Sequence, residues 1–176
     1  MTEIMNLLHN PRPGVPGEAE YTAGFAATVT YDAVGRLKVT SIGDYAYAAR
    51  PITLPAGDWV YSAWLRGDVG GSDPTTTENR GLYVIVDGKF IAHAPFAGKD
   101  KRYTARFHLD AETTVSLRLA GPSTVGDSMA WYAMILASKQ DYDQMRSLTD
   151  ANGDPLNLTW FDGNTYPRNG GGGLAS

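Results

Sequence analysis

Hydrophobic and polar residues alternate along the chain between residues 23 and 137. A period of two is the spacing of a β-strand with one buried face. The segments RYTARFHLD (102–110) and TTVSLRLAG (113–121) show it without error. About nine such segments follow one another, with turn residues between them, which predicts an antiparallel β-sandwich.

Three further segments refine this prediction. In GDWVYSAWLRG (57–67) the alternation places Trp59 and Trp64 on opposite faces of one strand. The segment DSMAWYAMILA (127–137) is apolar on both faces, as expected of a central strand that is covered on both sides. The Asp87-Gly88 pair predicts the tight turn of a hairpin. The predicted core comprises Phe25, Val29, Leu37, Val39, Trp59, Tyr61, Leu65, Val84, Val86, Phe107, Leu109, Val115, Leu117, Leu119, Ile135 and Leu136.

The two ends of the chain differ from this middle part. Residues 1–22 contain three prolines, which oppose both helix and central strand, so an extended arm is expected there. Residues 138–176 form a C-terminal extension with a Gly-rich tail, and residues 138–150 contain the one pattern compatible with a helix, of about two turns. We expect residues 1–22 and 150–176 to pack mostly on other chains, because their composition cannot build a core.

Composition and charge narrow the possible roles. The absence of cysteine excludes disulfides, thiolate metal sites and a cysteine nucleophile. The 15 basic and 19 acidic residues are well mixed and give a net charge of −4, so no basic block indicates nucleic acid. No secretory signal peptide and no long apolar run is found, so we expect synthesis in a cytoplasm and no membrane insertion.

Four short motifs carry a resemblance to a known family. They are NLLHNPRP (6–13), LPAGDWVYSAWLRG (54–67), VSLRLAGPS (115–123) with the strand that follows it, and WFDGNT (160–165). In this order they resemble the jelly-roll carbohydrate-binding-type domains of minor tail proteins from tailed bacteriophages, particularly those that infect actinobacteria. The resemblance implies a jelly-roll-like sandwich over residues 23–137 and a structural role in the virion, as a minor tail or capsid-decorating subunit.

The resemblance also implies partners. A virion subunit contacts other virion proteins and further copies of itself. The last motif contains the sequence Phe-Asp-Gly (161–163), which we call the FDG element. In longer relatives this element leads into a tip-attachment or receptor-binding segment. Here its aromatic neighbours Trp160, Phe161 and Tyr166 are expected to anchor the C-terminal extension on a neighbouring subunit, because aromatic side chains dominate interface energy.

Calcium-binding relatives use acidic residues near the N-terminal arm and the last strand. The corresponding candidates here are Glu18, Glu20 and Asp127, and three side chains are too few for the six to eight oxygens that calcium prefers. Where family members often carry an aspartate after the tryptophan of the last strand, this chain has Tyr132 after Trp131. We therefore expect no metal and no cofactor.

Catalytic groups do not converge in the sequence. His9, His93 and His108 lack the spacing of a metal or catalytic motif, and no G-x-S-x-G element is present. The acidic pair Asp141 and Asp143 falls in an irregular segment and is expected to be solvated. The sequence therefore favours a protein that is not an enzyme.

Glycan binding is the alternative function. Sugar rings bind where a flat aromatic face meets a few polar groups. Trp64 and Arg66 share one strand face, and Tyr45, Tyr47 and Tyr83 are candidates to join them against a cell-surface polysaccharide. The competing explanation is that Trp64 packs under a loop or at a subunit interface, where tryptophan and arginine are also enriched.

Overall fold

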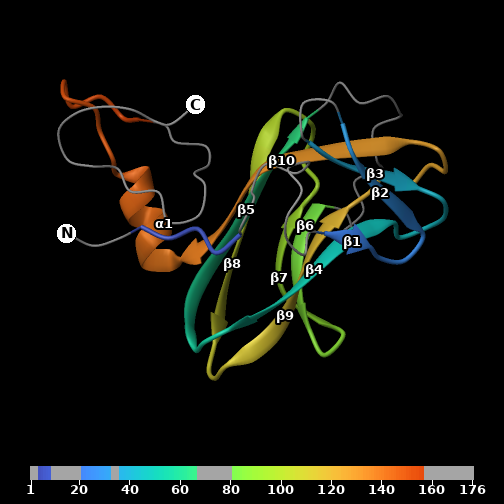
Figure 1. The fold of residues 1–176 in the computed structure, drawn as a ribbon, viewed down its shortest axis with the longest axis horizontal. Coiled ribbons are helices and arrows are strands. Elements are labelled where there is room, and N and C mark those ends of the chain that lie inside the picture. The colour runs from blue at the N-terminus through green and yellow to red at the C-terminus, as the bar shows by residue number, and fades with distance from the viewer. Residues whose placement is uncertain (1–3, 9–20, 33–35, 67–80, 157–176) are drawn as a thin grey trace.

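The computed structural model describes residues 4–8, 21–32, 36–66 and 81–156. These residues form two antiparallel sheets of five strands each, packed face to face (Figure 1). The first sheet has the order β1-β4-β9-β6-β7 and the second the order β2-β3-β10-β5-β8. The strands are β1 (Thr22–Ala23), β2 (Ala27–Tyr31), β3 (Leu37–Ser41), β4 (Tyr47–Leu54), β5 (Gly57–Arg66), β6 (Gly81–Val86), β7 (Lys89–Pro95), β8 (Lys101–Leu109), β9 (Thr113–Ala120) and β10 (Ser128–Ser138), and one helix, α1 (Lys139–Arg146), follows them.

The strand order confirms the predicted all-β sandwich and its jelly-roll character. From β3 onward each strand crosses to the opposite sheet, apart from the hairpin that joins β6 to β7. The result is the pair of interlocked four-stranded groups β3-β10-β5-β8 and β4-β9-β6-β7, which is the arrangement of a jelly roll. The short strands β1 and β2 extend one edge of each sheet.

The core lies between the inner faces of the two sheets, and the alternation predicts most of it. Trp59 and Tyr61 are buried there, and Trp64 on the other face of β5 is not part of this cluster. Phe25 was predicted in the core and is 66% exposed. Ala26 has a positive φ of 50° and precedes the first residue of β2, so the period of two does not extend back through this turn to Phe25.

Three other predicted core residues need adjustment. Val29 and Val86 are only partly buried and pack against the edge of the core. Ile135 is fully buried, yet it faces away from the first sheet and belongs to a second cluster under α1. A bulge in β10 between Tyr132 and Ile135 changes which residues of this strand face the first sheet, so alternation alone misplaces Ile135.

Residues 4–8 hold this bulge in place. The side-chain amide of Asn6 donates to the Met134 carbonyl at 3.2 Å, and its oxygen accepts from the Leu136 amide at 3.0 Å. Ile4 and Leu8 are 2% and 1% exposed. We expected the N-terminal arm to pack on other chains, and for residues 4–8 this is wrong. Their apolar side chains find burial within this chain, and Asn6 satisfies backbone groups that the bulge leaves unpaired.

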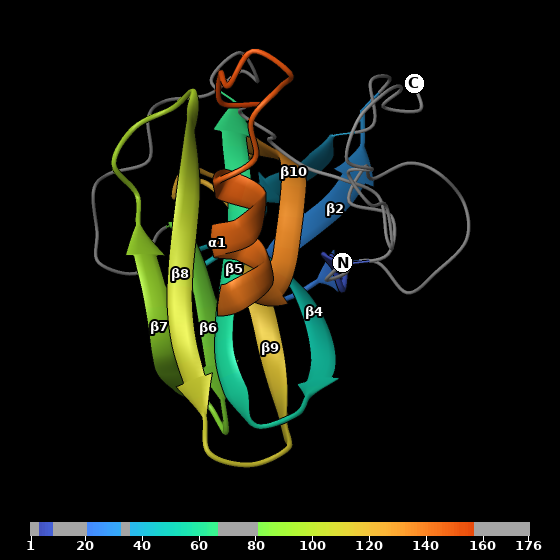
Figure 2. The ribbon, with the colours of Figure 1, turned by 90° about the vertical axis from the view of Figure 1, so that its left-hand side faces the viewer.

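Helix α1 lies where the sequence placed a short helix. Figure 2 shows it across the outer face of the second sheet, in front of β5 and β10. The Ser138 hydroxyl accepts from the Asp141 amide at 3.1 Å and caps its first turn. Tyr142 and Met145 form one buried cluster with Ile135 and Ala137 of β10, which explains why β10 is apolar on both faces. Within the described ranges no helix is long and apolar enough to cross a membrane.

Candidate functional site: an aromatic recess on the first sheet

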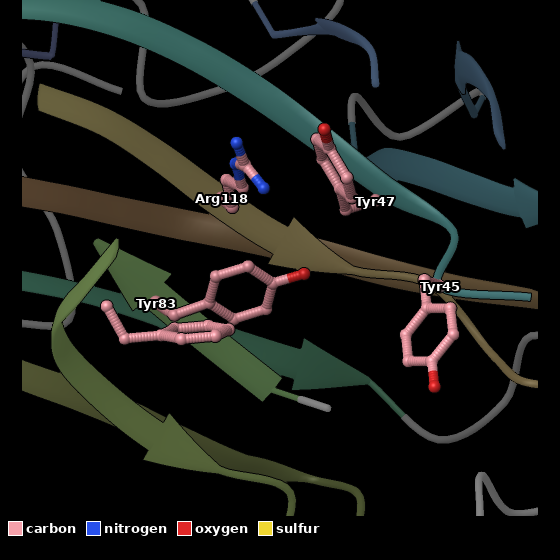
Figure 3. Close-up of a pocket in the computed structure, with 5 residues that line it drawn as sticks. Tyr45, Tyr47, Tyr83 and Arg118 are labelled. Carbon is pink, nitrogen blue, oxygen red and sulfur yellow. The ribbon is translucent and has the colours of Figure 1, made fainter. Parts of the chain in front are cut away.

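A recess of about 250 Å³ opens on the outer face of the first sheet (Figure 3). Its lining is largely aromatic and contains one charged group; it consists of Tyr45, Tyr47, Tyr83, Phe90 and Arg118. We call this feature the aromatic recess. Three of the five glycan candidates from the sequence, the tyrosines, thus meet at one place.

The register of the strands brings the lining residues together. Arg118 on β9 is directly opposite Tyr83 on β6 and opposite Ala49 on β4. Tyr47 pairs with Ala120, two residues along β9 from Arg118, on the same face. The small side chains of Ala49 and Ala120 leave room for their larger neighbours.

The floor of the recess is buried, and its rim is exposed. Tyr83 is only 5% exposed, and its ring packs edge-on against Phe90 with 5.3 Å between ring centroids. His93 also contacts this pair, 6.1 Å from each ring. Phe90 and Tyr45 are 54% and 59% exposed, so both offer ring surface to a ligand. A buried aromatic floor with exposed aromatic sides suits a flat, partly apolar ligand.

Tyr47 and Arg118 form the polar side of the recess. The guanidinium carbon of Arg118 lies 4.3 Å from the centroid of the Tyr47 ring, the distance of a close cation–π contact. Gly24 lies against the Tyr47 ring, and a β-carbon at Gly24 would overlap it. Figure 3 shows the two side chains next to each other on neighbouring strands, with Tyr45 further along the sheet.

In the described part of the chain, Arg118 is the only charged side chain that lines the aromatic recess. Its Nε donates to the Ser116 hydroxyl at 3.3 Å, which fixes the plane of the guanidinium. Among the residues that the structure describes, Arg118 forms no ion pair. The two terminal nitrogens therefore remain available for a ligand.

Two of the predicted site residues lie elsewhere. Trp64 and Arg66 are on the outer face of the second sheet, so the single group of five candidates that we expected divides into two. Trp64 stacks on Tyr132 with centroids 6.3 Å apart and at an interplanar angle of 28°, and Arg102 lies 5.8 Å from its ring. The Trp64 indole nitrogen is buried without a hydrogen-bond partner among the described residues.

Arg102, which lies beside Trp64, forms hydrogen bonds to two other strands of the second sheet. It donates to the Ser62 hydroxyl at 2.9 Å and to the Ala133 carbonyl in the β10 bulge at 3.2 Å. Burial lowers the pKa of Arg102 to about 10, so the side chain stays charged at neutral pH. Ser62 and Arg102 are thus engaged with each other on this face of the second sheet.

Sequence reasoning missed Phe90 and Arg118. The signal for Arg118 was present, because it occupies an outward position of the alternating strand 113–120. Phe90 gave no such signal. The two-residue turn at Asp87-Gly88 has positive φ at both residues, and it pairs Val86 with Lys89 and Ile85 with Phe90. A bulge follows at Ile91, which has no partner on β6. Because Phe90 pairs with Ile85, and Ile85 lies two residues from Tyr83 on β6, Phe90 lies on the same face as Tyr83.

The remaining candidates that the structure describes do not form a second site. Of the calcium candidates only Asp127 lies in the described residues, where its carbonyl accepts from the Ser41 amide. No group of three possible metal ligands occurs in the described ranges. Glu18, Glu20 and His9, and the anchor residues Trp160, Phe161 and Tyr166, lie outside them.

The acidic and histidine residues that remain have structural partners. Asp143 pairs with Lys139 at 2.6 Å, and Asp141 interacts with the Ser138 cap of α1. His108 is exposed between Asp58 and Asp110, and its hydrogen bond to Asp58 raises the pKa of the imidazole. Comparison with known proteins adds no assignment, since neither a protein-family model nor a curated protein matches this chain.

Proposed function

We propose that this protein binds a glycan, and that the aromatic recess is the binding site. The observation that carries the proposal is that four aromatic side chains, Tyr45, Tyr47, Tyr83 and Phe90, line one recess together with Arg118. Apolar C–H faces of a sugar ring stack on such rings, and a few fixed polar groups orient its hydroxyls. The volume of about 250 Å³ is below the roughly 300–1,000 Å³ of pockets for drug-sized molecules, so one sugar unit of a chain is the expected occupant.

The experiment is a glycan array probed with the wild-type protein and with three variants. Phe90→Ala and Tyr47→Ala each remove an aromatic ring of the recess, and Trp64→Ala removes an aromatic residue of the opposite sheet as the matched control. We expect the two recess variants to lose binding and the control to keep it. Loss of binding in the Trp64 variant alone would move the site to the second sheet.

We also propose that this protein is a component of a tailed-phage virion, located on the tail or on the capsid and in contact with other virion proteins. It rests on the family resemblance. Its support is that the three motifs within the described residues meet at β10. Asn6 of the first motif bonds to β10, β5 of the second pairs with it, and β10 follows directly on the third.

Labelling tests this setting directly. Antibody or gold labelling of whole particles, viewed by electron microscopy, is expected to mark the tail or the capsid surface. Purified particles that lack the protein in mass spectrometry would contradict a virion role and leave the glycan proposal standing.

A further inference from the structure

We propose that the sugar taken by the aromatic recess is acidic: a uronic acid whose carboxylate is held by Arg118. This inference rests on the glycan-binding function proposed above and specifies its ligand class. The first argument is charge. Arg118 is the only charged side chain among the described residues of the lining, in a protein whose net charge is −4. A cation kept on the wall of a binding recess, without an ion-pair partner among the described residues, complements an anionic ligand.

The second argument is the geometry of the guanidinium. Its face is occupied, because it stacks on the Tyr47 ring at 4.3 Å, and its Nε is engaged by Ser116. What remains is the edge that carries the two terminal nitrogens. Two parallel N–H groups match the two oxygens of a carboxylate, which makes this the most specific contact an arginine forms.

The third argument is preorganisation. The Ser116 hydroxyl and the Tyr47 ring hold the guanidinium from two directions, and Gly24 gives the Tyr47 ring its space. The side-chain entropy of Arg118 is therefore partly lost before a ligand arrives, which favours binding. Tyr83 and Phe90 then receive the apolar face of the sugar ring while the carboxylate reaches Arg118.

The test compares trigalacturonic acid with its methyl ester, which has the same rings without the charge. Binding of both to the full-length protein is measured by NMR titration. We expect the acid to bind about tenfold more tightly or better, as a charge-assisted pair supplies, and its affinity to fall as salt is added.

Three variants assign the effect to one residue. Arg118→Gln is expected to lower the affinity for the acid to the affinity for the ester. Arg118→Lys keeps the charge without the paired donors, and its affinity for the acid is expected to lie between those of the wild type and of Arg118→Gln. Arg66→Gln, which makes the same change of charge on the other sheet, is the matched control and should bind as the wild type does. Thermal unfolding of each variant checks that the fold is intact.

The outcomes separate this inference from the function on which it rests. Equal binding of acid and ester, unaltered in Arg118→Gln, would overturn the acidic ligand and leave glycan binding in place. A sulfated neutral chain that binds as tightly as the acid would overturn the assignment to a carboxylate. Failure of the protein to bind any sugar on the array or in solution would overturn both.

Discussion

Trp59 and Trp64 lie five residues apart on β5, and their side chains point to opposite faces of the second sheet. Trp59 is in the core with its indole nitrogen bonded to the Pro55 carbonyl at 3.1 Å, whereas Trp64 stacks on Tyr132 at the outer face. An odd separation in a strand always has this result, because successive side chains alternate. The same rule separates inward from outward residues in the strand segments that have no bulge.

The two tryptophans are expected to contribute unequally to stability. Trp59→Ala should lower the free energy of unfolding by about 3–5 kcal/mol, because it empties a core site between the sheets. Trp64→Ala should cost about half as much or less, since the ring is half-buried and its removal also removes an unpaired indole nitrogen. Urea unfolding of both variants is the measurement, and equal losses would contradict the assignment of faces.

Asn6 is expected to contribute strongly to the stability of the fold, although it lies near the N-terminus. Asn6→Ala leaves the Met134 carbonyl and the Leu136 amide without their partner, which should cost about 2–4 kcal/mol. Hydrogen exchange at the Leu136 amide should accelerate as well. Asn152→Ala, in an exposed turn, is the control. An Asn6 variant as stable as that control would mean that the bulge in β10 does not need residues 4–8.

The hydroxyls of Tyr21 and Tyr61 are 2.6 Å apart within the core. Replacing either one by phenylalanine leaves the other hydroxyl buried without this partner, while replacing both removes the polar pair altogether. We expect the double variant to lose less stability than the sum of the single variants, by about 1 kcal/mol or more. A double-mutant cycle from thermal unfolding is the measurement, and additive losses would argue against the hydrogen bond.

The same pair predicts how stability changes at high pH. Burial raises the pKa of both phenols well above the ordinary value of 10.0. The unfolded chain therefore releases these protons above about pH 10 while the folded protein keeps them, so stability is intact below that pH and falls above it. Each phenol contributes a slope of about 1.4 kcal/mol per pH unit. The Tyr21→Phe, Tyr61→Phe double variant should show a shallower decline in unfolding experiments between pH 9 and 11.

Gly24→Ala is expected to impair the aromatic recess without unfolding the protein. The added methyl group overlaps the Tyr47 ring and pushes it from its place against Arg118. Glycan affinity should fall to the level of Tyr47→Ala. Gly43→Ala, whose added carbon meets only Ala26 at 3.2 Å, is the matched control. Unchanged binding in the Gly24 variant would show that the position of the Tyr47 ring does not matter to the ligand.

The alternation of residues by itself determined the all-β class, the hairpin turn at Asp87-Gly88 and the inward faces of most strands. These features depend on local chemistry: a period of two places side chains on two faces, and Asp-Gly accepts the positive φ of a tight turn. The rule fails at Phe25 and Ile135, where a left-handed Ala26 and the bulge in β10 interrupt the period.

Only the tertiary structure decided which outward residues meet. Tyr47, Tyr83 and Arg118 come from three strands that are far apart in sequence, and their pairing depends on the crossing order of the two sheets. Trp64 looked equally suitable in the sequence and lies on the opposite sheet. Alternation determines the face on which a residue lies, but long-range strand pairing determines its neighbours on that face, and no local pattern encodes that pairing.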